Sequence, residues 1–435
     1  MNLRIGILGG GESGVAAALL AKKMGYSVFL SDFRVIPDQY KQELLDHKIP
    51  FEEEGHTYDA LALSDLIIKS PGVPNRSPII AYLLTKDISI ISEIEFAFRH
   101  QNGTIVGITG SNGKSTTTSL VYHILKTAKK NCFLGGNIGK AFSRLVNDNE
   151  SSIYVIEISS FQLDDVMDFR PQIALLTNIT ADHLDRYNNS FDAYANTKIR
   201  IVENQTEEDI LIYNSSDIES VKTIERSTFN SKILELNDSN LSSILMDENK
   251  EAFKLQLQGK HNLYNAAMAT LCCRTMGILE DIIKAGLETF KAIEHRMESF
   301  ALIDGVSFIN DSKATNIDSV YFALEGLEQP IVWIVGGEDK GNDYSQLYKL
   351  VKAKVKAIII LSIHTEKIVA AYSDLDIPIV KTQKIEEAVE TALELSKNGD
   401  VVLLSPACAS FDLFHNYEDR GMQFKNQVLQ LNQVV

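Results

Sequence analysis

The stretch GITGSNGKSTT occupies residues 107–117, at the end of an apolar run and at the start of a segment with helical periodicity. A strand that leads through a glycine turn into a helix is the context of a phosphate-binding loop. Glycine lets backbone N–H groups approach the phosphates, and a helix N-terminus favours anions. Lys114 is expected to reach the outer phosphates, and Ser115 or Thr116 to hold magnesium.

The loop departs from the Walker pattern, because Ile108 stands where a glycine is usual. The turn residues Gly110, Asn112 and Gly113 and the following run of hydroxyl side chains still fit a cradle for phosphates. We therefore predict a nucleotide site at this loop, with ATP and Mg²⁺ as the expected cofactors.

A second glycine turn, Gly9-x-Gly11-x-x-Gly14, follows the first apolar strand, and Asp32 ends the next strand. This spacing is typical of dinucleotide-binding folds, in which the turn faces a diphosphate attached to a ribose. Three interpretations are open: a nicotinamide cofactor, a UDP group, or a turn that only packs helix on strand. Because the chain already has a predicted ATP site, we favour UDP.

Short β-branched runs alternate with amphipathic segments along the chain, which predicts an α/β protein with parallel sheets. We expect three domains: a Rossmann-like one (1–92), a central P-loop ATPase type with a mostly parallel sheet (93–295), and a Rossmann-like C-terminal one (296–435). The stretch 214–254 gives no clear pattern. Strands are expected at 5–8, 28–30, 66–69, 89–91, 104–109, 153–159, 173–179, 306–310, 331–335, 357–361 and 401–404, and a helix at 261–276.

The composition narrows the function classes. A net charge of −16 argues against nucleic acid or an anionic membrane as partner, since both need a dense basic patch. The four cysteines follow no metal-ligand spacing, and no apolar run approaches the ~20 residues of a membrane span. We expect a monomeric cytoplasmic protein with reduced thiols.

Acidic and histidine residues follow two central strands at the edge where parallel sheets bind ligands. Glu157 lies where a phosphate-loop protein places a magnesium carboxylate. The segment NITADHLDRY then supplies Asp182, His183 and Asp185, and Lys198 follows in a helical pattern. These residues are candidates for a metal site.

Nine segments, in this order, resemble the Mur ligase family over essentially the whole chain. They are GITGSNGKST, GGNIG (135–139), SSFQL, NITADHLDRY, GKHNLYNAAMA, HRMES, INDSKATN, GGEDKGND and SPACASFD. SSFQL and SPACAS resemble the member that adds D-glutamate. The resemblance implies an ATP-dependent amide ligase that joins D-glutamate to UDP-N-acetylmuramoyl-L-alanine through an acyl phosphate in peptidoglycan synthesis.

The resemblance also implies a role for each matching position. ATP phosphates would contact the loop from Gly110 to Thr116, the adenine side would contact Asn262 and Asn265, and the ribose and phosphates would contact Arg296 and Asp311. The implied metal ligands are Ser115, Glu157, His183 and Lys198, the last as a carbamate formed with carbon dioxide, because an ammonium cannot coordinate a metal.

Two substrates and a base complete the implied site. The UDP-sugar peptide would contact Gly11, Ser13, Asp32, Arg34, Ser70, Gly72, Asn137 and Ser159. D-Glutamate would contact Lys313, Thr315, Lys340, Ser410 and Tyr417. The family has Phe where Tyr417 stands, and the loop at 337–340 is more acidic than a dicarboxylate favours. Either His183 or His295 would take the proton of the attacking amine.

The sequence also allows two rival functions. A ligase of the folylpolyglutamate synthetase type shares the central loop chemistry but lacks a dinucleotide-type first domain. A nicotinamide-dependent oxidoreductase would use the turn from Gly9 to Gly14.

Overall fold

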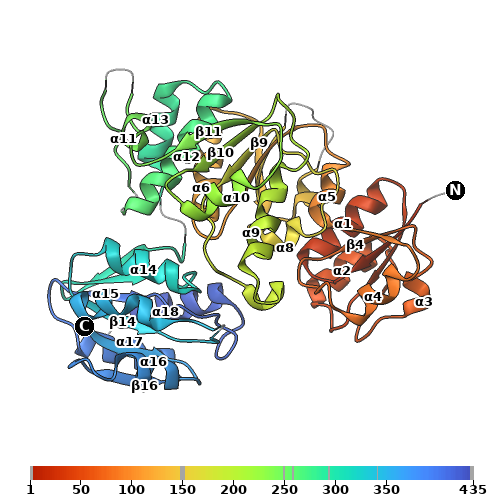
Figure 1. The fold of residues 1–435 in the computed structure, drawn as a ribbon. Helices are drawn as coiled ribbons and strands as arrows, with labels where there is room; N and C mark the ends of the chain where they lie inside the picture. The colour runs from red at the N-terminus through yellow and green to blue at the C-terminus, as the bar shows by residue number, and fades with distance from the viewer. Residues whose placement is uncertain are drawn as a thin grey trace. The chain divides into compact units, whose positions relative to one another are not determined.

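The computed structural model describes residues 3–146, 152–247, 250–256, 259–291, 294–339 and 341–431. The chain forms two compact units. The first contains residues 1–254 and 264–289, and the second contains residues 255–263 and 290–435. The first unit contains two parallel sheets and the second contains one mixed, mostly parallel sheet, and helices cover these sheets, which confirms the predicted α/β class (Figure 1).

The N-terminal sheet of the first unit has the strand order β3-β2-β1-β4-β5, and all its pairs are parallel. This is the order of a dinucleotide-binding fold, so the Rossmann-like prediction is confirmed. Its strands are β1 (Arg4–Leu8), β2 (Ser27–Ser31), β3 (Phe51–Glu52), β4 (Leu66–Lys69) and β5 (Ser89–Ser92). Its helices are α1 (Glu12–Lys23), α2 (Asp38–Asp46), α3 (Tyr58–Leu61), α4 (Pro78–Leu84) and α5 (Glu93–Phe98).

The central sheet of the same unit is parallel throughout, in the order β11-β10-β9-β6-β8-β7. Its strands are β6 (Thr104–Thr109), β7 (Cys132–Gly136), β8 (Ile153–Glu157), β9 (Ile173–Leu176), β10 (Ile210–Asn214) and β11 (Lys232–Leu236). The helices are α6 (Lys114–Thr127), α7 (Phe142–Leu145), α8 (Ser160–Leu163), α9 (Phe191–Ile199), α10 (Ile218–Glu225), α11 (Leu241–Ile244), α12 (Lys260–Thr275) and α13 (Glu280–Thr289), with 3₁₀ turns η1 (Leu184–Tyr187) and η2 (Arg200–Val202).

Close packing holds these layers together. One buried apolar cluster runs through both sheets of the first unit. Helix α13 packs directly on α6 (Figure 1), and Gly286 permits this contact, because a Cβ there would lie 2.8 Å from Ile124 Cγ1.

The second unit contains one mixed sheet, in the order β12-β13-β17-β14-β15-β16, in which only β12 runs antiparallel to its neighbour. Its strands are β12 (Glu298–Ile303), β13 (Val306–Asn310), β14 (Ile331–Val335), β15 (Val355–Leu361), β16 (Ile379–Thr382) and β17 (Val401–Leu404). The helices are α14 (Ile317–Gly326), α15 (Tyr348–Lys354), α16 (Glu366–Tyr372), α17 (Ile385–Glu394) and α18 (Tyr417–Leu431), with the 3₁₀ turn η3 (Tyr344–Leu347).

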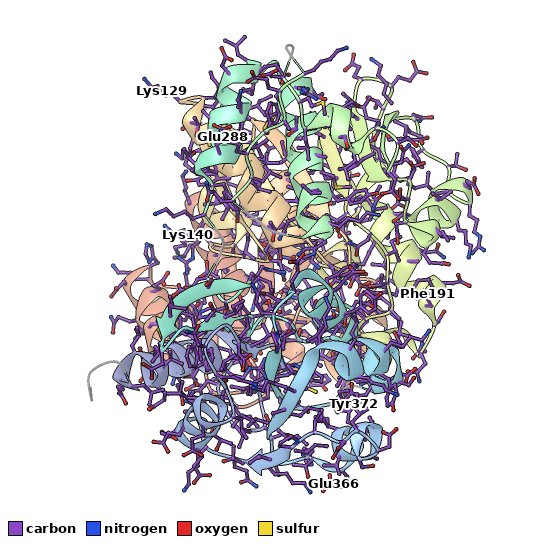
Figure 2. The ribbon with its side chains drawn as sticks, turned by 90° about the vertical axis from the view of Figure 1, so that its left-hand side faces the viewer. Lys129, Lys140, Phe191, Glu288, Glu366 and Tyr372 are labelled. Atoms are coloured by element: carbon purple, nitrogen blue, oxygen red, sulfur yellow. The ribbon has the colours of Figure 1, made fainter. Side chains whose placement is uncertain are left out.

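The core of this unit lies between the sheet and its helices. Trp333, the single tryptophan of the sequence, is fully buried in β14. Tyr372, labelled in Figure 2, is buried at one end of α16 and donates a hydrogen bond to Tyr344 O (3.1 Å), whereas Glu366 at the other end of the helix is exposed.

Several predicted elements differ from the observed ones. The strands expected at 153–159 and 173–179 end earlier, at Glu157 and Leu176. Strands β3, β7, β10, β11, β12 and β16 were not predicted. The stretch 214–254 contains α10, β11 and α11, and the first four residues of β11 are exposed, so no apolar pattern marked that strand.

The four cysteines Cys132, Cys272, Cys273 and Cys408 are free thiols with buried side chains, as predicted. Burial raises the pKa of Cys272 to about 12 and that of Cys408 to about 11, so both stay protonated at neutral pH. No helix in the described part of the chain combines the length and apolar character needed to cross a bilayer.

Candidate active site

The predicted phosphate loop joins β6 to α6, as the sequence indicated. Gly113 caps α6 with φ +82°, a left-handed conformation that glycine adopts without strain. Lys114 Nζ donates to Gly110 O (2.8 Å) and Ser111 O (2.7 Å), so the side chain lies back over the loop. Ser115 and Thr116 are buried in the first turn of α6. A cation and a helix N-terminus therefore meet at one point, which favours polyphosphate.

The segment after β9 holds this loop in shape. Thr177 Oγ1 and Asn178 Nδ2 both donate to Asn112 O, at 2.6 and 3.1 Å. Asn178 Oδ1 accepts the backbone N–H of Asn112 at 2.9 Å. A Cβ on Gly110, which has φ +141°, would lie 1.9 Å from Thr177 Oγ1. The loop is therefore fixed before any nucleotide arrives.

Helix α12 approaches the same loop through Asn265. A Cβ on Gly113 would lie 2.4 Å from Asn265 Oδ1, and Thr117 Oγ1 donates to that oxygen at 3.2 Å. Asn262 lies one helical turn earlier and is also buried. The structure thus brings Asn265 to the phosphate loop, and the contact with the adenine side that the resemblance implies for Asn262 and Asn265 stays a prediction.

Lys198 of α9 is 2% exposed, and its Nζ donates to Gly110 O at 2.7 Å. The ammonium also lies 4.5 Å from the centre of the Tyr194 ring. Burial lowers the pKa of Lys198 well below its usual value and the charge of Lys114 adds to this effect, although Asp182 and Glu157 oppose it. A neutral amine is the form that attacks carbon dioxide, so the environment favours carbamate formation.

The remaining metal candidates lie at the carboxyl ends of neighbouring strands. Glu157 ends β8, is buried, and accepts a hydrogen bond from Asn137 Nδ2 at 2.8 Å. His183 follows β9 with φ +52°, and its Nε2 lies 3.7 Å from Asp182 Oδ2.

These residues fit magnesium rather than a metal bound wholly by protein. Among the described residues, no group of three or more His, Cys, Asp or Glu side chains could hold a metal ion. Magnesium needs no such cage, because one or two carboxylates, a hydroxyl and substrate phosphates are its usual ligands. Glu157 and Ser115 offer that donor set beside the phosphate loop.

Ser159 was predicted to contact substrate, and in the structure it caps α8. Its backbone N–H and its hydroxyl both donate to Gln162 Oε1, at 2.9 and 3.0 Å, within a capping box. The SSFQL motif therefore has a structural explanation as well: it ends β8 and starts α8.

The N-terminal glycine turn is as tight as the sequence indicated. Gly9 has φ +105°, and a Cβ on Gly14 would lie 1.8 Å from Gly9 O. Asp32 accepts the backbone N–H of Gly10 (2.5 Å) and of Arg34 (2.7 Å), so its carboxylate joins two turns. Gly11 caps α1, Ser13 lies in its first turn, and the Arg34 side chain is exposed.

Arg186 was missed in the sequence, although it lies inside the motif NITADHLDRY. Its Nη2 donates to Pro71 O (2.7 Å) and Val73 O (3.2 Å), and its guanidinium lies 4.1 Å from the centre of the Phe161 ring. Phe161 in turn makes an edge contact with His183, with ring centres 5.0 Å apart. Arg186 therefore links two regions. One is the turn that contains Ser70 and Gly72, which are predicted to contact the UDP-sugar peptide, and the other is the segment after β9 that contains the predicted metal ligand His183.

A buried ion pair also connects the N-terminal sheet to the central sheet. Lys69 is 1% exposed, and its Nζ lies 2.7 Å from Asp165 Oδ2, in the segment after α8. Arg144 after β7 pairs with Glu12 (2.8 Å) and Glu43 (2.7 Å) of the N-terminal sheet's helices. One buried and two partly exposed ion pairs thus connect the two sheets of the first unit.

In the second unit, Asp311 and His295 lie around the end of β13. Asp311 accepts hydrogen bonds from Ser405 Oγ (2.8 Å) and the Met297 N–H (3.1 Å), and burial raises its pKa to about 7. His295 Nδ1 lies 2.8 Å from Asn310 Nδ2, and burial lowers the pKa of His295. The ring of His295 is thus enclosed, which is a poor setting for a base that must reach a substrate amine.

Three of the residues predicted to bind D-glutamate, Lys313, Thr315 and Ser410, lie on the loops after β13 and β17, and Tyr417 begins α18. Lys313 Nζ lies 5.0 Å from the centre of the Tyr417 ring, a cation–π contact. Ser410 is buried and Thr315 half-buried. Lys340 lies outside the described residues.

Comparison with known proteins decides what kind of site this is. Sequence models of the MurD N-terminal domain, the Mur ligase middle domain and the Mur ligase glutamate ligase domain match residues 4–79, 108–273 and 295–408. The UDP-N-acetylmuramoylalanine–D-glutamate ligase of Christiangramia forsetii is 46% identical, over 99% of this chain and 100% of that protein. The chain belongs to the Mur ligase family.

Other relatives of this Mur ligase agree. The enzyme of the same name from Bacteroides fragilis is 44% identical over 98% of this chain and all of its own length. A UDP-N-acetylmuramate–alanine ligase from Thermotoga maritima shares the fold, with a TM-score of 0.62 at 18% identity and full coverage of both chains. The match to the MurD N-terminal domain argues against both rivals, because the glycine turn lies in a domain of MurD type, which is neither a nicotinamide-binding oxidoreductase domain nor a domain expected in a folylpolyglutamate synthetase.

Proposed function

We propose that this Mur ligase joins D-glutamate to UDP-N-acetylmuramoyl-L-alanine at the expense of ATP in peptidoglycan synthesis. The observation that carries the proposal is the pairing of a lysine-tipped phosphate loop with the buried amine of Lys198, which donates to Gly110 of the same loop. The full-length relatives named as D-glutamate ligases support the choice of acceptor.

The chemistry follows from the need to activate a carboxylate. A carboxylate oxygen of the sugar peptide attacks the γ-phosphorus of ATP, ADP leaves, and an acyl phosphate forms. The amine of D-glutamate then attacks the acyl carbon, and phosphate leaves as the amide bond forms. Lys114 and the loop N–H groups neutralise charge on the transferred phosphoryl group, which is the main task of a protein in phosphoryl transfer.

Magnesium would neutralise the phosphate oxygens when bound. Ser115, Glu157 and His183 are the residues proposed to hold it, together with Lys198 once that amine has become a carbamate. Asn262, Asn265, Arg296 and Asp311 are proposed to contact the nucleoside and phosphates.

The two substrates other than ATP, D-glutamate and the UDP-sugar peptide, are assigned to the remaining predicted residues. Lys313, Thr315, Ser410 and Tyr417 are proposed to bind D-glutamate, and Lys340 completes the set. The UDP-sugar peptide is assigned to Gly11, Ser13, Asp32, Arg34, Ser70, Gly72, Asn137 and Ser159. Of the two candidate bases, His295 is buried against Asn310, so we favour His183, which can take the proton only in a state in which it does not hold the metal.

The organisation and setting of the enzyme are also proposals. We assign residues 1–92 to the sugar nucleotide, 93–295 to ATP and 296–435 to the amino acid, since each range contains one sheet. We propose a monomer in the cytoplasm, a reducing compartment that the four free, buried thiols fit.

Phosphate release tests the proposal directly. The protein is incubated with ATP, Mg²⁺ and UDP-N-acetylmuramoyl-L-alanine, and D-glutamate is compared with L-glutamate and D-alanine. Turnover is expected with D-glutamate only, with one amide formed per phosphate. Equal turnover with every acceptor, or none with D-glutamate, would reject the assignment.

A further inference from the structure

Arg420 is a fully buried cation that the sequence did not single out. It lies in the first turn of α18, is 1% exposed, and is among the largest fully buried side chains of the described chain. Its five N–H groups form a rigid planar fork, so each hydrogen bond also fixes a direction.

The fork reaches three loops at once. Arg420 Nε donates to Ser312 Oγ (3.0 Å) and Nη2 donates to Ser312 O (2.8 Å). Nη1 donates to Gly336 O (3.3 Å), and Nη2 also donates to Cys408 O (3.2 Å). Ser312 Oγ in turn donates to Tyr417 O (2.8 Å) in the same helix.

These loops follow β13, β14 and β17, which are neighbours in the sheet. The loop after β13 continues into Lys313 and Thr315, and the loop after β17 into Ser410. Ser312 directly precedes Lys313, and Cys408 lies two positions before Ser410, and both Lys313 and Ser410 are proposed to bind the amino acid. Gly336 begins the loop that leads to Lys340.

Packing alone does not explain a guanidinium at this point. Its acceptors are three carbonyls and a hydroxyl, and among the described residues it forms no ion pair. Burial lowers its pKa to about 10, so it stays charged near neutral pH. An apolar side chain would fill the space without the cost of burying a charge, whereas only a fork can bind three loops in one geometry.

We propose that Arg420 is a positioning residue for the amino-acid acceptor: it sets the relative positions of the three loops that receive D-glutamate. The inference rests on the proposed function. It adds that acceptor affinity depends on a side chain that does not itself touch the acceptor.

Steady-state kinetics with each substrate varied in turn tests this role. In Arg420→Lys, which keeps the charge and loses the fork, KM for D-glutamate is expected to rise about tenfold, with KM for ATP and for the sugar peptide changed less than about twofold. In Arg420→Ala, added guanidinium chloride at low concentration is expected to restore part of the acceptor affinity.

The matched control removes a different, partly buried contact in the same sheet. Lys356 Nζ pairs with Asp400 Oδ2 at 2.7 Å, at the edge where β15 and β17 begin. Lys356→Met is expected to lower the melting temperature and to leave KM for D-glutamate within about twofold of wild type.

The outcomes separate the two proposals. Wild-type turnover with D-glutamate combined with an unchanged acceptor KM in Arg420→Lys would overturn the role of Arg420 alone. Equal increases in all three KM values, or an equal acceptor effect in Lys356→Met, would also overturn it, because they indicate general destabilisation. No wild-type turnover with D-glutamate would overturn the proposed function, and this inference with it. If Arg420→Ala does not fold, Arg420→Lys decides.

Discussion

Lys198 shows how one side chain can be prepared for chemistry by its surroundings. It is buried beside Tyr194, and the charge of Lys114 adds to the effect of burial in lowering its pKa. An ordinary surface lysine stays protonated near neutral pH and cannot attack carbon dioxide. The low pKa therefore gives the carbamate proposal a physical basis that does not depend on the family resemblance.

Replacing this amine tests the carbamate. Lys198→Ala is expected to lower kcat by about a hundredfold or more, because a metal-binding carboxylate would be lost. A short carboxylic acid such as acetate is expected to restore part of the activity by occupying the vacated space. Lys222→Ala, on the exposed face of α10, is the control and should behave as wild type. Full activity in Lys198→Ala would remove the carbamate from the mechanism.

At the scale of elements, the junction between the turn after β4 and the segment after β9 depends on Arg186. Two backbone carbonyls of the turn accept hydrogen bonds from Arg186, and the Arg186 guanidinium stacks on the Phe161 ring. A side chain of the metal segment thereby holds a turn assigned to the sugar nucleotide.

Arg186→Met should loosen that turn while keeping the bulk of the side chain. KM for UDP-N-acetylmuramoyl-L-alanine is expected to rise about tenfold, and KM for ATP less than about twofold. Arg226→Met removes an exposed arginine of the same unit, paired with Asp192, and serves as control. An increase confined to the ATP KM would contradict the assignment of the turn.

The contrast between predicted and missed features has a physical pattern. Strand β6 was predicted with its observed bounds, because its apolar run ends directly before the glycine of the phosphate loop. The strand at 153–159 was predicted too long because the capping box at Ser159 starts a helix inside an apolar run. Arg186 and Arg420 could not be found from the sequence, since their partners lie far away along the chain, such as Pro71 and Ser312.

At the scale of the whole molecule, the two units have separate buried clusters. Trp333 reports on the second unit only, and the adjacent thiols Cys272 and Cys273 report on the first. Fluorescence and thiol labelling during denaturation therefore follow different parts of the same chain.

Asp311 should make the free energy of unfolding of the second unit depend on pH. Burial raises its pKa to about 7, so the folded state binds this proton more tightly than the unfolded chain does. The contribution of Asp311 to the free energy of unfolding is thus fully present at low pH and falls as the pH rises from about 4 to about 7.

Asp311→Asn removes that dependence. Between about pH 5 and pH 8 the variant is expected to gain more than about 1 kcal/mol relative to wild type, measured by Trp333 emission in urea. Labelling of Cys272 and Cys273 should show no such change. Parallel pH profiles of variant and wild type would contradict a raised pKa, and an equal shift in labelling would contradict separate units.

The outer strand of the central sheet bears on how this enzyme behaves in concentrated solution. Strand β11 lies at the edge of its sheet and exposes Ile233 and Leu234 to water. Unpaired backbone groups beside apolar side chains form a template for strand-to-strand aggregation, and the charges of Lys232 and Glu235 on either side act as gatekeepers against it. These two surface charges are therefore expected to limit association of the folded enzyme through the edge of the central sheet.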